Sequence, residues 1–341
     1  MTAVPPEPRL RAAVLGAGSW GTTFAAVLSD AGCDVTIWGR SAQTCDEITR
    51  THRNEAYLPG VELPTGITAS TDAAGVVARA DLVAIAIPSQ SARATLEPLR
   101  GAFGPRAVAV SLMKGVELGE DRRMSQVVAE ALGIHADRVA VVSGPNLAKE
   151  IAQHQPTATV VASTSEETAR LVARACASSY FRPYTNDDVV GVELCGAVKN
   201  VIAIAVGISQ GRGLGYNTMA TVITRGLVEI TRLGLALGAD AETFPGLAGL
   251  GDLMATCASP DSRNHTLGVH LGQGMALDDA IRATGGTAEG VKSSRSVLEL
   301  AAKVGVEMPI TAAVVAVLHE GLPVDQLAPL LLARPHKAEG L

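Results

Sequence analysis

The amino-acid sequence predicts a doubly wound, mainly parallel α/β sheet followed by an all-helical C-terminal domain. Three observations predict this fold. A glycine-rich turn follows the first apolar run, short β-branched runs alternate with helical stretches through the first half, and the second half has helical period without any strand pattern. Strands that alternate with helices are typical of a parallel sheet with helices on both faces.

The first element is a βαβ unit built around a glycine motif. An apolar strand runs directly into Gly16-x-Gly18-x-x-Gly21, a helix is expected over 22–28, and a second strand is expected to end at Trp38. Gly16 permits a tight turn, Gly18 lets the backbone approach a pyrophosphate, and Gly21 lets the helix pack on the strand. Plain turns also contain glycines at this spacing, but the flanking strand and helix favour a Rossmann-type dinucleotide site.

The remaining strands of the first half place small, polar or basic residues at one edge. Strands are expected at 12–15, 34–38, 82–87, 107–112, 138–142 and 158–162. Ligands bind outside the carboxyl ends of the strands in doubly wound sheets. The residues after the first five strands include Lys114, Gly144 and Asn146, so we expect one continuous ligand edge.

The residue after the second strand bears on the choice of cofactor. NAD sites usually place Asp or Glu about 20 residues past the glycines, where the carboxylate accepts from the ribose 2′-hydroxyl. This chain has Gly39 and Arg40 there, with no acidic residue before Asp46. Arg40 could pair with a 2′-phosphate, or it could be a solvated arginine in a turn. The sequence therefore favours NADP(H), with NAD(H) still possible.

Composition limits the classes of protein that the chain can belong to. Its 341 residues are 47% hydrophobic and 18% charged, which predicts a globular chain of two domains. A net charge of −6 provides no basic surface for nucleic acid or an anionic membrane. The five cysteines show no metal-ligand pairing, which is typical of a reducing compartment, and no metal site is expected.

The composition of the two ends, and the change from a mixed strand and helix pattern to a purely helical one near 186–188, suggest how the chain is divided into domains. We expect a flexible lead over 1–10, a dinucleotide-binding domain over 11–187, an all-helical substrate and catalytic domain over 188–332, and a polar tail over 333–341. The proline-rich lead lacks the apolar core of a signal peptide. We expect no apolar run close to the roughly 20 residues that span a bilayer, and hence a cytoplasmic protein.

Lys199 is the candidate for proton transfer. It interrupts the apolar helix expected over 190–209, where Gly196 and Ala203 share its face and are expected to leave space for a small ligand. Partial exclusion of water lowers the pKa of a lysine toward neutral, so that it can donate or accept a proton. The alternative is a lysine that reaches to the surface, but its small neighbours and the adjacent Asn200 favour the catalytic interpretation.

Other polar residues are candidates for binding an anionic substrate or the cofactor. Lys114 could hold an anionic or carbonyl oxygen, although a surface lysine in a turn fits the spacing equally well. Ser262, Arg263 and Asn264 offer a hydroxyl, a planar cation and an amide to a phosphate. Ser262 could also cap a helix, which is compatible because helix N-termini bind anions. Glu289 could accept from cofactor hydroxyls or be an exposed loop residue.

From about Ala12 to Leu332 the chain resembles the bacterial-type, NAD-dependent glycerol-3-phosphate dehydrogenase family. The motifs that carry the resemblance are GAGSWGT (16–22), IPS (87–89), KG (114–115), SGPNLAKE (143–150), GAVKNVIAIAVG (196–207), ITRGL (223–227), FPGLAGLGDL (244–253), SRN (262–264) and EG (289–290). Several long motifs in the correct order are far more specific than the glycine pattern alone.

The resemblance implies hydride transfer between NAD(P)H and dihydroxyacetone phosphate, giving sn-glycerol 3-phosphate for phospholipid synthesis. Lys199 matches the proton donor or acceptor. Substrate-contacting positions of the family match Lys114, Gly144, Asn146, Lys199, Asp252, Ser262, Arg263 and Asn264. Cofactor positions match Ser19, Trp20, Arg40, Lys114, Ala148, Arg263, Thr287 and Glu289, besides the three glycines. A homodimer is possible.

The chain departs from the family pattern at two of these positions. Asn146 stands where the family often has Ser or Thr, and Thr287 stands where an aliphatic residue is frequent. In the implied chemistry Lys199 gives the proton to the ketone oxygen, and Asp252 orients Lys199 or a substrate hydroxyl. Arg263 binds the phosphate, while Lys114 polarises the carbonyl or holds the substrate.

Two competing hypotheses remain at the level of sequence. Another two-domain dehydrogenase, of the 3-hydroxyacid or 6-phosphogluconate type, would share this architecture, but SRN at 262–264 and the GLGDL turn argue against it. A non-catalytic NADP(H)-sensing module is expected to lack the proton-transfer residue, whereas Lys199 is present.

Overall fold

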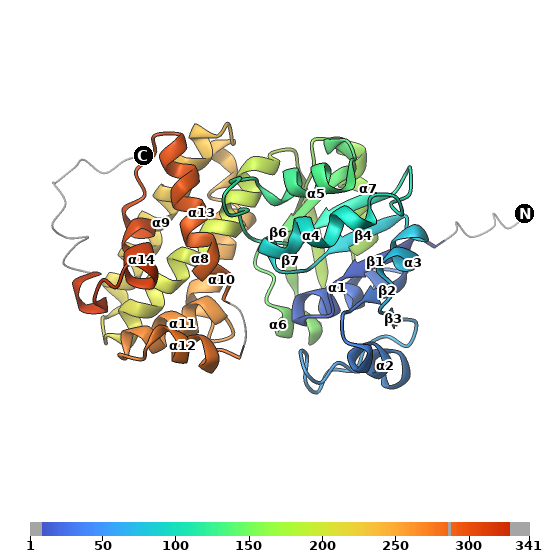
Figure 1. The fold of residues 1–341 in the computed structure, drawn as a ribbon, viewed down its shortest axis with the longest axis horizontal. Coiled ribbons are helices and arrows are strands. Elements are labelled where there is room, and N and C mark those ends of the chain that lie inside the picture. The colour runs from blue at the N-terminus through green and yellow to red at the C-terminus, as the bar shows by residue number, and fades with distance from the viewer. Residues whose placement is uncertain (1–8, 286–287, 328–341) are drawn as a thin grey trace, which may run out of the picture.

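The computed structural model describes residues 9–285 and 288–327. Most of the predicted lead, the predicted tail and Thr287 lie outside these residues. The chain forms two parts that lie side by side, a sheet flanked by helices and a bundle of helices (Figure 1). The second part begins where the last strand ends and the long helix α8 starts.

The sheet has eight strands in the order β3-β2-β1-β4-β5-β6-β7-β8. Their bounds are β1 Arg11–Leu15, β2 Asp34–Trp38, β3 Thr68–Ser70, β4 Leu82–Ile85, β5 Val108–Ser111, β6 Val139–Ser143, β7 Thr157–Ala162 and β8 Phe181–Asn186. Every neighbouring pair is parallel except β6 and β7, which confirms the predicted fold class. The carboxyl ends of β1, β2, β4, β5 and β6 therefore meet at one edge.

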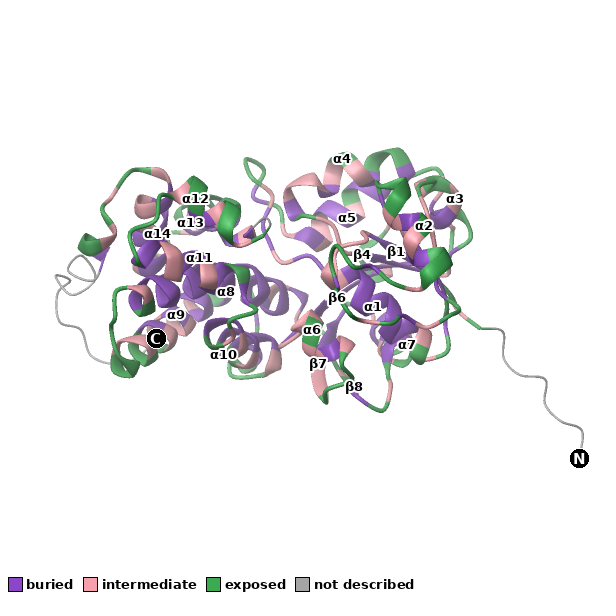
Figure 2. Ribbon diagram, turned by 90° about the horizontal axis from the view of Figure 1, so that it is seen from below, coloured by how far each residue is buried: buried purple, intermediate pink, exposed green. Residues whose placement is uncertain are grey.

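Helices cover both faces of the sheet. They are α1 Ser19–Asp30, α2 Ala42–Thr51, α3 Ala73–Ala78, α4 Ala92–Leu96, α5 Met124–Leu132, α6 Ala148–Ala152 and α7 Glu166–Cys176. One apolar core joins the sheet to α1 and α7 through Phe24, Val172 and Phe181. The other joins it to α3, α4 and α5 through residues such as Leu96 and Val127. Figure 2 shows the buried strands between these two layers.

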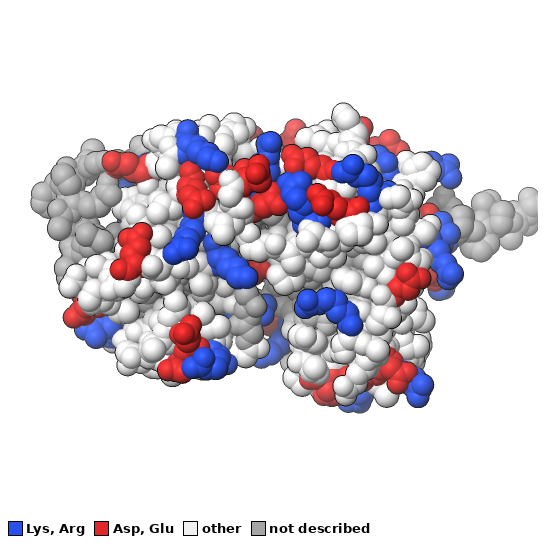
Figure 3. Space-filling model, in the orientation of Figure 1, with Lys and Arg blue, Asp and Glu red and all other residues white. Residues whose placement is uncertain are grey.

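Charged side chains of both signs are mixed over the surface. Figure 3 shows lysine and arginine interspersed with aspartate and glutamate on the face that it displays, without an extended basic area. Over the whole chain 34 acidic residues outnumber 28 basic ones. This distribution gives a phosphate backbone no continuous positive surface to follow.

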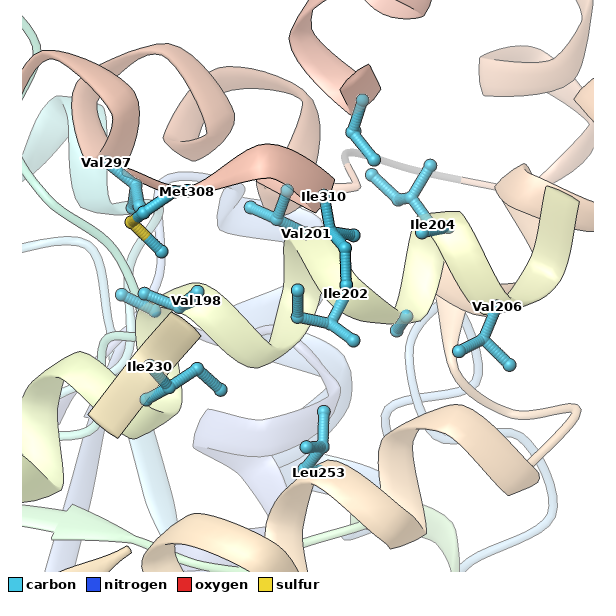
Figure 4. Packing of buried hydrophobic residues seen from close by; sticks show 14 of the residues in the cluster. Val198, Val201, Ile202, Ile204, Val206, Ile230, Leu253, Val297, Met308 and Ile310 are labelled. Atoms are coloured by element: carbon cyan, nitrogen blue, oxygen red, sulfur yellow. The ribbon is translucent and has the colours of Figure 1, made fainter. Parts of the chain in front are cut away.

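The second part is built around the buried helix α8, Val189–Gly211. Around it lie α9 Tyr216–Ala236, α10 Asp252–Ala258, α11 Arg263–Gly272, α12 Leu277–Ala283, α13 Glu289–Lys303 and α14 Pro309–His319. Figure 4 shows Val198, Val201 and Ile202 of α8 among side chains of the surrounding helices. Because residues on all sides of α8 are buried, its polar side chains lie inside the protein rather than in solvent.

Helix α8 overturns one expectation from the sequence. With 23 residues and a mean hydropathy of 1.9 in its most apolar window, it is long and apolar enough to cross a membrane. Although α8 contains Glu193 and Lys199, its mean hydropathy remains high enough for a membrane-spanning helix. However, 94% of that window is buried inside the protein, so α8 is a core helix.

Candidate active site

The glycine turn after β1 has the geometry that a dinucleotide phosphate requires. Gly16 has φ +122°, and a Cβ there would collide with the carbonyl oxygen of Ala86. A Cβ on Gly21 would collide with the carbonyl oxygen of Gly16, so α1 packs closely on the turn. Gly18 instead faces open space, with no other atom within 4 Å of its Cβ position. Gly18 is also the N-cap of α1 and supplies no side chain, which leaves the first amides of the helix for an anion.

Two further features of the structure fit NAD(P)(H). The indole Nε1 of Trp20 is buried and has no hydrogen-bond partner among the described residues. The same holds for Oε2 of Glu289, whereas its Oε1 accepts from the backbone N–H of Ser89, at 3.3 Å. Buried polar groups without partners are rare in folded proteins, and a bound ligand or an ordered water can satisfy them. The residues present therefore fit the cofactor.

Glu289 lies where the two parts of the chain meet. Burial raises the pKa of its carboxyl to about 7, although the positive charges of Arg263, Lys114 and Lys292 oppose the rise. With a pKa of about 7, the carboxyl of Glu289 can gain or lose a proton near physiological pH. Its contact with Ser89 connects the first turn of α13 to the segment that follows β4.

The other predicted cofactor residues lie near this edge of the sheet. Ser19 donates through Oγ to the carbonyl oxygen of Tyr57, at 2.6 Å, so its hydroxyl is already engaged. Ala148 begins α6, and its carbonyl oxygen accepts from Thr23 of α1, at 3.2 Å. Arg40 is exposed just beyond the end of β2. Thr287 lies outside the described residues.

Lys199, Asp252 and the half-buried Lys114 form one cluster. Lys199 is 6% exposed, and Nζ donates to Oδ1 of Asp252 and, at 2.7 Å, to Oγ1 of Thr256. Asp252, the first residue of α10, is 1% exposed. Its Oδ2 accepts from Nζ of Lys114 at 2.6 Å, and Lys114 also donates to the carbonyl oxygen of Gly144 at 3.1 Å. The two lysines, which come from opposite parts of the chain, are held on one carboxylate.

The environment of Lys199 favours loss of its proton. Burial lowers the pKa of Lys199 below its ordinary value, and the positive charge of Lys114 lowers it further. The Asp252 carboxylate opposes both effects and raises the pKa. A lysine that is balanced in this way can hold a proton and release it, which is what a general acid or base requires.

Gly196 has a different role from the one expected from the sequence. The space beside it is filled, because a Cβ on Gly196 would lie 2.9 Å from Oγ of Ser143 and 3.4 Å from Cγ of Lys114. The expectation that Gly196 leaves room for a small ligand is therefore wrong. Its missing side chain instead allows Lys114 to approach α8.

At the start of α11, Ser262 and Asn264 make hydrogen bonds within the protein, whereas Arg263 is exposed. Ser262 is the N-cap, and its Oγ accepts from the N–H of His265 at 3.3 Å. Asn264 donates to Oδ1 of Asn200 and accepts from the N–H of Gly290, both at 3.0 Å. Arg263 is exposed and has no ion pair with any residue that the structure describes. Its guanidinium is thus available to an anion.

A glycine seam sets the position of α11 against α8. Cβ atoms on Gly207 and Gly211 would lie 3.0 Å from the Cα atoms of Gly268 and Gly272, respectively. Close approach of the two backbones requires residues without a side chain here. The seam places the first turn of α11 beside Asn200, as the bond between Asn264 and Asn200 shows.

Sequence reasoning missed several polar residues around the cluster. Thr256 follows Asp252 by one helical turn, so the i, i+4 spacing could have indicated it. Ser143 and Ser293 are buried, and each has a hydroxyl without a partner among the described residues. Ser293 follows Glu289 by one turn and faces Gly115, whose Cβ would lie 3.1 Å from its Oγ. Asn146, which the sequence did predict, donates to Oγ1 of Thr159 at 3.0 Å, and its Oδ1 is buried without a partner among the described residues.

Comparison with known proteins agrees with this geometry. Residues 11–169 match the family described as NAD-dependent glycerol-3-phosphate dehydrogenase N-terminus, and residues 188–329 match its C-terminus. The chain is 57% identical to glycerol-3-phosphate dehydrogenase (NAD(P)+) of Streptomyces griseus over 330 residues, which are 97% of this chain and 98% of the relative. The relative of the same name from Corynebacterium jeikeium is 54% identical over 331 residues, 97% of this chain and 100% of the relative.

A solved structure gives the same result. The crystal structure of glycerol-3-phosphate dehydrogenase from Coxiella burnetii superposes with a TM-score of 0.91 at 39% sequence identity. The match covers 96% of this chain and 99% of that chain. Both parts of the fold are therefore shared.

Proposed function

The chain belongs to the NAD-dependent glycerol-3-phosphate dehydrogenase family and is an NAD(P)-dependent oxidoreductase that acts on a CH–OH group, and we propose that Lys199 is its proton donor. The reaction interconverts dihydroxyacetone phosphate and sn-glycerol 3-phosphate. Membership of this family decides against the other two-domain dehydrogenases and the non-catalytic sensor that the sequence left open. The observation that carries the role of Lys199 is its burial on the shared carboxylate of Asp252.

In the proposed mechanism the protein supplies the proton and positions the ketone. The bound reduced cofactor supplies the hydride. Lys199 holds a proton on Nζ and gives it to the carbonyl oxygen of the substrate as negative charge develops there. Asp252 keeps Lys199 protonated in a site from which water is largely excluded, and Thr256 fixes the direction of its Nζ. Lys114 polarises the same oxygen or holds the adjacent hydroxyl.

The phosphate of the substrate binds, in this proposal, at the first turn of α11. Arg263 offers its guanidinium, and the helix N-terminus adds a favourable dipole for an anion. Ser262 and Asn264 shape this turn through the bonds described above, while Gly144 and Asn146 form the opposite wall. The cofactor lies along Gly16, Gly18, Ser19, Trp20 and Gly21, with Arg40, Ala148 and Glu289 at its sides.

One assay tests the proposed reaction. The purified chain is mixed with dihydroxyacetone phosphate and either NADPH or NADH, and the absorbance of the reduced cofactor is followed. We expect oxidation of the cofactor that depends on the phosphorylated ketone, with sn-glycerol 3-phosphate as product. Turnover of a 3-hydroxyacid but not of this ketone would contradict the proposed substrate.

Several broader statements are part of the same proposal. We place the domain division at 187/188, because β8 ends at Asn186 and α8 begins at Val189. The enzyme acts in the cytoplasm and supplies the backbone of phospholipids. In the same proposal the chain forms a homodimer. Light scattering on the purified chain tests the homodimer, and a monomeric mass would refute it.

A further inference from the structure

Asn54 is a buried amide that reaches the glycine turn from a distant segment. It lies in the loop between α2 and β3 and is only 1% exposed. Its Nδ2 donates two hydrogen bonds, to the carbonyl oxygen of Ala17 at 2.9 Å and to Oγ1 of Thr22 at 2.8 Å. Ala17 lies between the first two glycines of the motif, and Thr22 lies in the first turn of α1.

The loop around Asn54 is itself firmly held. The carbonyl oxygen of Asn54 accepts from the N–H of Leu58 at 2.8 Å. Leu58 and Leu63 are 1% and 3% exposed and belong to the core under the sheet. Ser19 donates to the carbonyl oxygen of Tyr57 in the same loop. The loop thus contacts the glycine turn at both Asn54 and Tyr57.

The bond to Ala17 fixes the orientation of one peptide plane. The Ala17–Gly18 peptide bond is trans, so its C=O and N–H groups point in opposite directions. Because the C=O is held by Asn54, the N–H of Gly18 points away from that side chain. This N–H has no hydrogen-bond partner in the described part of the chain, and Gly18 faces open space.

We propose that Asn54 is a positioning residue that locks the Ala17–Gly18 peptide, so that the N–H of Gly18 is presented to the cofactor pyrophosphate. This inference rests on the proposed placement of the pyrophosphate at the glycine turn. A free glycine-rich turn can rotate its peptide planes, and that loss of orientation weakens anion binding. Asn54 removes this freedom without touching the cofactor.

The amide itself provides a sharp test, because only its donor side is used. Oδ1 of Asn54 is buried and has no partner among the described residues. Asn54→Asp therefore keeps the shape of the side chain and removes both donors, leaving an oxygen that repels the carbonyl of Ala17. Asn54→Ala removes the side chain altogether. Thr49→Val is a matched control, because Thr49 bonds the backbone of Ala69 in the same domain but not the glycine turn.

The measurements are the Kd for NADPH, the kcat at saturating NADPH and the melting temperature. We expect both Asn54 variants to raise the Kd on the order of tenfold while kcat and the KM for the ketone stay within about twofold. Thr49→Val should keep the parental Kd. Adenosine 2′-monophosphate, which has no pyrophosphate, should bind the parent and the variants equally. Should Asn54→Ala fail to fold, Asn54→Asp decides by the same measurements.

Two results would overturn the inference. One is a parental Kd for NADPH in a folded Asn54→Asp variant. The other is an equal loss for NADPH and adenosine 2′-monophosphate together with a lower kcat, which is the pattern of general structural damage. Gly18→Val separates this inference from the site assignment, because a side chain there must block the pyrophosphate. Unchanged NADPH binding in Gly18→Val would refute the placement of the cofactor itself.

Discussion

The ammonium groups of Lys114 and Lys199 bind the two oxygens of a single buried carboxylate, that of Asp252. Two positive charges on one negative charge leave a net positive site, which suits a substrate that carries a phosphate and develops negative charge on its carbonyl oxygen. It also means that neither lysine is fully neutralised. The proton on Lys199 is therefore held less strongly than in an ordinary ion pair.

The first prediction concerns Lys199 as the proton donor. Lys199→Met keeps most of the volume of the side chain but has no proton to give, so kcat should fall by about 10²–10⁴-fold. The rate is measured with dihydroxyacetone phosphate at saturating NADPH. Binding of NADPH and the melting temperature serve as controls for folding. A folded variant with near-parental turnover would remove Lys199 from the mechanism.

The second prediction concerns the pH dependence that Asp252 imposes. Ketone reduction requires the protonated form of Lys199, so the rate falls as pH rises through the pKa of this lysine. Asp252 raises that pKa, and Asp252→Asn should move the fall in kcat/KM toward lower pH besides lowering the rate. Asp279→Asn, which changes an exposed carboxylate on α12, is the matched control. A pH profile that keeps its position in Asp252→Asn would contradict the electrostatic role.

The third prediction concerns stability and Glu289. The pKa of this carboxyl is raised to about 7 by burial, so its favourable neutral form is fully present below the unfolded pKa near 4.5. The associated stability is lost as pH rises through 7. Glu289→Gln cannot ionise. Between about pH 4.5 and pH 7 its free energy of unfolding should therefore fall less than that of the parent, by roughly 3 kcal/mol at most. Melting temperatures of the cofactor-free proteins at several pH values check this.

The control for Glu289 lies on the same helix. Glu299→Gln changes an exposed carboxyl of α13 and should follow the parental curve. If the stability curves of the parent and Glu289→Gln run parallel between about pH 4.5 and pH 7, the pKa of the Glu289 carboxyl is not raised in the folded protein.

The fourth prediction concerns recognition of the substrate phosphate. Arg263→Ala should lower kcat/KM for dihydroxyacetone phosphate by about 10–100-fold, because it removes a charged hydrogen bond to the phosphate. The value for unphosphorylated dihydroxyacetone should change little. Arg282→Ala, which removes an exposed arginine of α12, is the control. Equal losses for both substrates would show that Arg263 does not bind the phosphate.

The fold class could be predicted because the sequence carries two clear periodicities. Strands buried on both faces read as apolar β-branched runs, α9 shows helical period, and α8 reads as a long apolar stretch. Strands β3 and β8 were missed for physical reasons. β3 has only three residues, and β8 is an edge strand that contains Arg182 and Pro183, a composition that edges tolerate and central strands do not.

The residues of the site could be predicted better than their relationships. Motifs indicated Lys114, Lys199 and Asp252, yet these lie far apart along the chain, and their convergence depends on how the two parts pack. Asp252 is 138 positions from Lys114 and 53 from Lys199. Gly196 was interpreted wrongly for the same reason, since local spacing cannot show what a distant segment places beside it.

The last prediction concerns the choice between NADPH and NADH. Arg40 follows β2 immediately after Gly39, and it is exposed without an ion pair among the residues described here. A guanidinium in this place can pair with the 2′-phosphate that NADPH has and NADH lacks. A partly exposed charged hydrogen bond contributes about 1.5–3 kcal/mol, so kcat/KM should favour NADPH by roughly 10–100-fold.

Arg40→Asp should reverse this preference, because a carboxylate repels the 2′-phosphate and accepts from the 2′-hydroxyl of NADH. Arg40→Ala should only abolish it, which separates loss of attraction from gain of repulsion. Arg50→Asp, at an exposed arginine of α2, should leave the ratio unchanged. A parent that prefers NADH, or an Arg40→Asp variant whose ratio of kcat/KM values stays parental, would show that Arg40 points away from the ribose.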